Sequence, residues 1–190
     1  QELNNILTNL KKTNAALVDD MIPNVFSLGE LQKVLANLLR ENVPIRDMET
    51  IIEVMGDYGA AIKDTDMLTE YVRQALKRTI SQRFAEVGQL KVITVDAQLE
   101  NRIMAAVKKV DSGSYLALEP QVIQSIINAT TAEINKIKDI VSEPIILSSP
   151  IVRIYIKKLL DQFISNVVVL SFNEIDQDIQ IQAIGNIAIS

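Results

Sequence analysis

The 190-residue sequence contains neither cysteine nor histidine, and this absence excludes several kinds of site. Without cysteine there is no disulfide and no thiol nucleophile, and without either residue most zinc sites are excluded. Histidine-based proton transfer is excluded as well. Glycine is scarce, at 6 residues, and the sequence has no G-x-x-x-x-G-K or G-x-G-x-x-G run that would hold a phosphate. We therefore expect no enzyme activity and no cofactor.

Long apolar runs and basic clusters are also missing. No run of about 18 apolar residues occurs, so the sequence predicts no membrane-spanning helix. The formal net charge is −5, and no basic patch indicates binding to nucleic acid or anionic lipid. We expect no nucleic-acid partner and no direct membrane contact by these residues. With 48% hydrophobic and 23% charged residues, the chain is long enough for one domain or two small ones.

The charged residues that do cluster form no recognisable metal site. Three acidic groups lack the glycine and the terminal glutamate of a calcium loop, so we interpret them as solvated loops. Two lysine pairs are expected near the end or on the outer face of a helix, where cations complement the helix dipole. The acidic groups are Asp19 with Asp20, Asp64 with Asp66, and Glu174 with Asp176 and Asp178; the lysine pairs are Lys108 with Lys109 and Lys157 with Lys158.

The clearest structural signal lies in residues 27–59, SLGELQKVLANLLRENVPIRDMETIIEVMGDYG. Ser27 and Glu30 have the S-x-x-E spacing of a capping box, which predicts a helix that begins at Leu28. Apolar residues then recur at three- and four-residue steps, as they do on one face of an amphipathic helix. Pro44 interrupts this pattern and separates it from a second helix that fills the rest of the run.

The rest of the first half is predicted to be helical too. Apolar periodicity predicts helices over 2–12 and 15–21, and a long stripe from Leu68 to Ile80 predicts one further helix, capped by Asp64 or Thr65. Four or five helices with no strand pattern indicate an all-helical subdomain. We place its boundary in the segment AEVGQ, which divides the chain into residues 1–87 and 88–190.

Strands alternate with helices in the second half. LKVITV, PIIL and VVVL are predicted strands. Asp96 caps a predicted helix that extends to Val110, DSGS is a loop, and further helices open at Pro120 and at Ser149 with Pro150. The closing IQIQAIGNIAI reads as an edge strand or a hairpin arm. This alternation is typical of a small α/β subdomain with a parallel or mixed sheet, so the fold class of the whole chain is α+β.

The loop IPNVF, residues 22–26, carries three large apolar side chains between two predicted helices. One interpretation is a hydrophobic staple, in which Phe26 precedes the cap and packs on Leu31. The other is the wall of a depression that binds a partner. Acidic residues flank this loop, and they favour a partner with apolar anchors and basic flanks. They are Asp19, Asp20 and Glu30.

Long runs of the sequence resemble the cytoplasmic C-terminal region of the FlhA family, the flagellar type III export-gate proteins. The runs are LVDDMIPNVFSLGELQKVLANLLRENVPIRDMETIIEVMGDYG, KDTDMLTEYVRQALKR, SSPIVRIYIKKLLDQF and VVVLSFNEID. Injectisome export-gate proteins are similar but more distant, and the segment SLGELQKVLANLLRENVPIRD favours the flagellar branch. A generic helical adaptor unrelated to secretion has the same composition and periodicity, so only the resemblance separates the two.

The resemblance implies a function in protein export. Members of the family form a ring, thought to be nonameric, which serves as a docking platform at the bacterial inner membrane. Flagellar chaperones with their substrates and soluble export ATPase components bind to it, and transport draws on the proton motive force. We therefore expect the cytoplasmic portion of a membrane protein. Because the sequence opens at Gln1 and not at Met, we expect a longer chain with preceding transmembrane segments.

The resemblance also implies candidate residues. The family's chaperone pocket lies between the preceding cytoplasmic subdomain and the start of the helical one, and the matching positions here are those of IPNVFSLGE. The last subdomain of the family is thought to swing relative to the rest, which makes Gly88 the candidate hinge. The candidates for partner binding are Ile22, Pro23, Val25, Phe26, Leu28 and Glu30.

Overall fold

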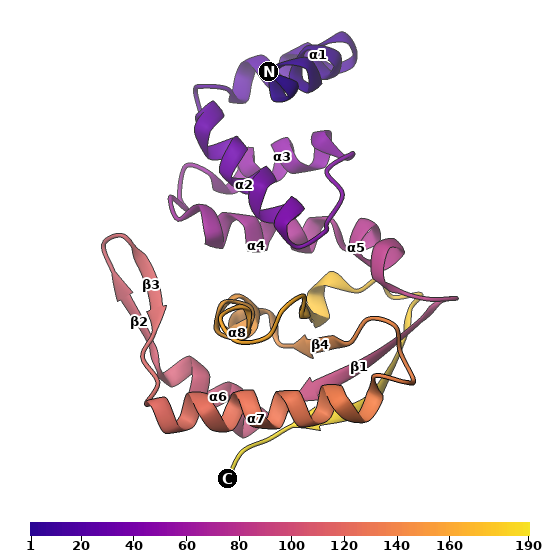
Figure 1. Ribbon diagram of the computed structural model, residues 1–190. Coiled ribbons are helices and arrows are strands. Elements are labelled where there is room, and N and C mark those ends of the chain that lie inside the picture. Colours follow the sequence, from indigo (N-terminus) through magenta and orange to yellow (C-terminus); the bar gives the residue numbers. More distant parts are fainter. The chain divides into compact units, whose positions relative to one another are not determined.

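The chain divides after Arg83 into two units in the computed structural model, which describes residues 1–190 (Figure 1). The first unit is Gln1–Arg83 and the second is Phe84–Ser190. The first is helical, and the second carries a parallel sheet, which confirms the predicted α+β class. No helix in either unit has the length and apolar content needed to span a bilayer.

Five helices build the first unit, and side chains cap several of them. The capping box at Ser27 is present, and the carboxylate of Asp64 accepts from the amides at the start of its helix, so both predicted caps are confirmed. The predicted break near residue 14 is a kink inside one helix, where Asn14 has non-helical backbone angles. The helices are α1 (Glu2–Met21), α2 (Leu28–Arg40), α3 (Met48–Tyr58), α4 (Thr65–Ala75) and α5 (Lys77–Phe84).

The long helix predicted from Leu68 to Ile80 is wrong, because it is two helices. The break falls at Leu76, whose amide donates to the carbonyls of both Val72 and Arg73. This tightened turn lets Leu76 and Ile80 both lie in the core, at 2% and 0% exposure. A regular apolar stripe therefore continued through a bend that periodicity alone does not reveal.

The core of the first unit lies where α4 packs on both α2 and α3, while α1 packs on α3. Burial of each aliphatic side chain contributes about 1.5–3 kcal/mol before the entropy cost. The side chains that are fully shielded from solvent include Leu31, Val34, Leu38, Ile51, Ile52, Met55, Leu68 and Val72. Every one of them belongs to an apolar stripe identified in the sequence.

The second unit is built around a four-stranded, wholly parallel sheet in the order β5-β4-β1-β6. β4 is buried along its whole length, as is typical of a central parallel strand. β6 lies at the edge beside β1, so the edge-strand reading of the C-terminal segment is confirmed. The strands are β1 (Gln89–Val95), β4 (Ile145–Ser148), β5 (Val168–Ser171) and β6 (Gln180–Ile187).

Helices connect these strands and cover the sheet. α7 packs on β6, and α8 packs on β4 and β5. Asp96 caps α6 through the amide of Gln98 at 3.1 Å, as predicted. After β5, a short 3-10 turn, η1 (Phe172–Glu174), places Glu174 next to the buried Arg153 of α8. The helices are α6 (Ala97–Ala105), α7 (Pro120–Ile137) and α8 (Pro150–Asp161).

An antiparallel hairpin replaces the predicted end of the α6 helix. It consists of β2 (Val107–Val110) and β3 (Gly113–Leu116), so the predictions of a helix to Val110 and of a plain loop at DSGS are wrong. Lys108 and Lys109, expected near a helix end, lie on β2 instead. Figure 1 shows the hairpin standing out from α6 and the start of α7. Lys157, by contrast, does lie in helix α8, where it pairs with Asp161 at 2.7 Å.

Candidate docking site

The loop between α1 and α2 is a tight, hydrogen-bonded turn. The amides of Val25 and Phe26 both donate to the carbonyl of Met21, at 2.9 and 3.2 Å. The peptide bond between Ile22 and Pro23 is cis. The two hydrogen bonds to Met21 therefore tie the loop to the end of α1.

The candidate residues of this loop differ in their exposure to solvent. Phe26 is buried, at 1% exposure, and lies against Gly59 at the end of α3. Ile22 and Val25 are half-buried, and Pro23 is exposed. The exposed atoms of the loop thus belong to residues 22–25, while Phe26 belongs to the core of the unit.

A hollow of about 290 Å³ lies between α1 and this loop. Seven residues line it. Five of them come from α1, and the other two, Ile22 and Leu28, are among the six candidates. At the kink of α1, the Asn14 side chain donates to Glu49 of α3 at 2.7 Å. No pattern in the sequence predicted that α1 takes part. The lining residues are Asn4, Leu7, Thr8, Lys11, Val18, Ile22 and Leu28.

Two of the three acidic residues expected around this hollow, Asp19 and Glu30, already have partners within the unit. Glu30 accepts from the amide of Ser27 at 3.3 Å, so its carboxylate serves the start of α2. Asp19 pairs with Lys11 at 3.0 Å, and both side chains are about half exposed. The hollow has an apolar floor of Leu7 and Val18, and the charged residue of its lining is Lys11 and not one of the expected acids.

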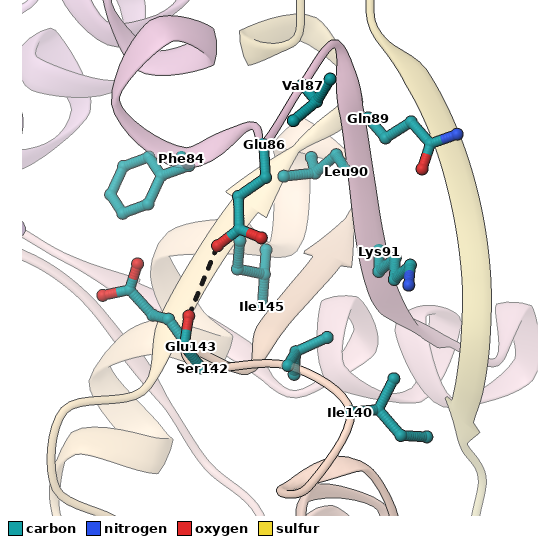
Figure 2. Close-up of a pocket in the computed structure, with 11 residues that line it drawn as sticks. Phe84, Glu86, Val87, Gln89, Leu90, Lys91, Ile140, Ser142, Glu143 and Ile145 are labelled. Carbon is teal, nitrogen blue, oxygen red and sulfur yellow. Dashed lines mark hydrogen bonds between the residues drawn. The ribbon is translucent and has the colours of Figure 1, made fainter.

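A second hollow, of about 230 Å³, lies within the second unit near the start of β1 and β4 (Figure 2). Its lining is mixed: the hydroxyl of Ser142 donates to Glu86 at 3.4 Å, while Ile140 and Ile145 supply apolar surface. Figure 2 shows these side chains arranged around the open space below the turn that begins β1. The remaining lining residues are Phe84, Val87, Gln89, Leu90, Lys91, Val141 and Glu143.

Gly88, the candidate hinge, lies in the turn at the edge of this second hollow. Glu86 and Gln89 exchange two backbone hydrogen bonds, at 2.9 and 3.0 Å, and so close a two-residue turn over Val87 and Gly88. Both central residues have positive φ, 50° and 73°. This is the type I′ geometry of tight hairpins, which suits glycine and disfavours valine.

Neither hollow contains an arrangement typical of catalysis. No group of three or more aspartate or glutamate side chains converges on a point where a metal ion would bind. The polar atoms of both hollows come from amides, hydroxyls, carboxylates and lysines that lie among apolar side chains.

Comparison with known proteins identifies the family. Residues 1–180 match the FHIPEP family. The flagellar biosynthesis protein FlhA of Bacillus subtilis is 40% identical over 186 residues, which is 97% of this chain and 28% of that protein. The chain therefore spans just over a quarter of the length of this relative.

Two solved structures share the fold. The nonameric EscV cytosolic domain from the type III secretion system is 29% identical, with a TM-score of 0.81 over 100% of this chain and 56% of that one. The complex of the Chlamydia pneumoniae CdsV and CdsO proteins matches at 29% identity, with a TM-score of 0.85 over 99% of this chain and 55% of that one. The match extends through both units, and the chain belongs to the FHIPEP family of export-gate proteins.

Proposed function

We propose that this chain is part of the cytoplasmic portion of a bacterial type III protein export gate, where copies of it form a ring that docks export partners. The observation that carries the proposal is the match of the complete chain to the EscV cytosolic domain, whose structure is a nonamer. The structure that contains both CdsV and CdsO adds that a similar chain binds another protein.

The flagellar branch is the favoured assignment. The flagellar biosynthesis protein FlhA of Bacillus subtilis is 40% identical, whereas the low calcium response locus protein D of Yersinia pestis is 32% identical and the EscV cytosolic domain 29%. The expected partners are therefore flagellar chaperones with their substrates and the soluble export ATPase components. The second candidate is an injectisome export gate, which the fold match alone supports equally well. No feature of either hollow favours a catalytic role over docking.

Within the first unit, we assign docking to the hollow between α1 and the 22–26 loop. Ile22 and Leu28 provide its apolar wall, and Pro23 and Val25 extend this surface outward. Phe26 and Glu30 act indirectly, because the first anchors the loop in the core and the second caps α2. An apolar side chain of the partner would fill the hollow, in the manner of helix-in-groove recognition.

Calorimetry with a late-substrate flagellar chaperone bound to its cargo tests this assignment. The chaperone complex is titrated into this 190-residue chain and into a longer chain that adds the preceding export-gate residues. Ile22→Asp should abolish binding, because it places a charge on the wall of the hollow. Leu39→Asp is the matched control, since Leu39 is 53% exposed on α2 and does not line the hollow.

The outcomes separate the possibilities. Loss of binding with Ile22→Asp but not with Leu39→Asp supports the docking assignment. Binding by the longer chain that is unaffected by Ile22→Asp would show that the loop only anchors α2. Preference for an injectisome chaperone over a flagellar one would favour the second candidate. Sedimentation of the longer chain tests ring formation separately, because it requires no partner.

A further inference from the structure

The β2–β3 hairpin of the second unit has one face on the core and one face in solvent. Val107 and Leu116 pair across the strands and pack against the core of the unit. Side chains alternate between faces along a strand, so Lys108, Val110 and Tyr115 project from the opposite face. Val110 and Tyr115 are 50% and 53% exposed. The side chains of Val110 and Tyr115 are thus exposed to solvent on the same face as Lys108.

The outer edge of β2 has unpaired backbone groups. The hairpin is a two-stranded sheet with no third strand. The amide of Ala117 donates to the carbonyl of Ala106 just before β2. Along an antiparallel hairpin, pairs that exchange backbone hydrogen bonds alternate with pairs that do not, so Val107 and Lys109 belong to the pairs that do not. The amides and carbonyls of Val107 and Lys109 therefore point away from β3. Such an edge is a template for another strand.

The charge of this edge is opposite to that of the chain. Lys108 and Lys109 are both exposed, and neither makes an ion pair within the chain, whereas the whole chain carries a net charge of −5. The only acidic residue in the hairpin is Asp111, in its turn. Lysines on an edge strand also discourage pairing between copies. That role does not require the exposed Val110 and Tyr115 next to them.

We propose that the free edge of β2 binds an extended acidic segment of a partner protein, which adds as a third strand. Backbone hydrogen bonds to Val107 and Lys109 would supply affinity, as in other cases of strand addition. Because Lys108 and Lys109 point to opposite faces, two neighbouring acidic residues of the partner pair with them. An apolar residue next to this acidic pair then contacts Val110, and Tyr115 on the neighbouring strand extends the same exposed face.

Binding of synthetic peptides to the 190-residue chain tests this proposal. Three fluorescein-labelled peptides of about 10 residues, a length sufficient for one strand, are compared by fluorescence anisotropy. The first has acidic pairs flanked by valine and leucine, the second has lysine in place of the acidic residues, and the third has serine in place of the apolar ones. The chain variants are Lys108→Glu with Lys109→Glu and, separately, Tyr115→Ser.

A matched control is available on α7. Lys136→Glu with Lys138→Glu makes the same change of charge in the same unit, at two exposed lysines at the C-terminal end of α7. Lys136 pairs with Glu133, a surface contact expected to contribute less than about 1 kcal/mol. All four substituted lysines are exposed, so the folded state is expected to persist, and circular dichroism checks it.

We expect the acidic, apolar peptide to bind and the lysine peptide not to bind. Affinity should fall at least about tenfold with the β2 charge reversal, stay within about twofold with the α7 reversal, and fall at high salt. Amide resonances of β2 should shift on titration. Equal binding of all three peptides, no binding of any, or an equal effect of both charge reversals would overturn the proposal. These outcomes do not depend on the hollow of the first unit.

Discussion

Ser27 and Glu30 bond reciprocally at the start of α2. The hydroxyl of Ser27 accepts from the amide of Glu30 at 3.0 Å, and the carboxylate of Glu30 accepts from the amide of Ser27 at 3.3 Å. This pair fixes the first turn of α2, and so it fixes the position of Leu28 in the docking hollow.

Substitution Ser27→Ala should loosen α2. Loss of the cap leaves the amide of Glu30 without its partner and costs about 1 kcal/mol. Native-state hydrogen exchange measures this locally, and the amides of α2 should exchange about fivefold faster. Thr13→Ala serves as the control, because the Thr13 hydroxyl bonds only within α1. Unchanged exchange in α2 would show that packing alone holds its first turn.

Substitution Glu30→Gln separates the capping role of this side chain from a charge contact with a partner. Glutamine retains an oxygen for the Ser27 amide, so stability should change by only about 0.5 kcal/mol. If Glu30 acts through the cap, chaperone binding measured by calorimetry should stay within about twofold of that of the unsubstituted chain. A large loss of binding at unchanged stability would instead place Glu30 in direct contact with the partner.

The sequence predicted the capped helices because their signals are local. Ser27, Asp64 and Asp96 each accept from an amide within three positions, and that geometry needs no other part of the fold. The buried stripe of α2 and the strand β1 were found for the same reason, since each has the periodicity of its own element. Their packing partners did not have to be known.

The predictions that failed depend on contacts between distant residues. Val107 and Val110 continue the spacing of the α6 stripe, but Val107 pairs with Leu116 and Val110 pairs with Gly113. A helical stripe and one strand of a hairpin have similar apolar patterns over so few residues. The docking hollow was only partly predictable for a similar reason. Its loop was visible in the sequence, whereas the contribution of α1 depends on how that helix folds back.

A buried ion pair joins α8 to the turn after β5. Arg153 and Glu174 are 0% and 1% exposed, their side chains lie 3.6 Å apart, and Arg153 also donates to the carbonyl of Val169 at 2.8 Å. We expect Arg153→Met to destabilise the second unit by about 3 kcal/mol, because it leaves a buried carboxylate without its cation. Hydrogen exchange of the β5 amides provides the measurement.

Adding Glu174→Gln to Arg153→Met should restore part of this loss, because it removes the uncompensated charge. The surface pair of Lys136 with Glu133 provides the comparison: Lys136→Ala should cost less than about 1 kcal/mol, since its side chain is 70% exposed. A double variant no more stable than Arg153→Met alone would show that hydrogen bonds of Arg153, and not charge balance, dominate.

Substitution Val87→Asn should stabilise the second unit. The Val87 side chain is fully exposed and contributes no burial, yet its φ of 50° places a β-branched residue in left-handed geometry, which costs about 1–2 kcal/mol. Asparagine tolerates this geometry, and Asn-Gly is the preferred pair for such a turn. We therefore expect hydrogen exchange at Gln89 and Leu90 to slow about fivefold.

Gly88→Ala tests the same turn in the opposite direction. The added Cβ meets no atom within 4 Å, so any loss of stability reports the backbone geometry at φ +73° and not a steric clash. A loss of about 1 kcal/mol is expected.

If Val87→Asn stabilises the turn and also weakens binding of an export partner, then the strained valine is retained for docking, because strain persists where function requires it. If Val87→Asn leaves both stability and binding unchanged, valine is not strained at this position and is not needed there.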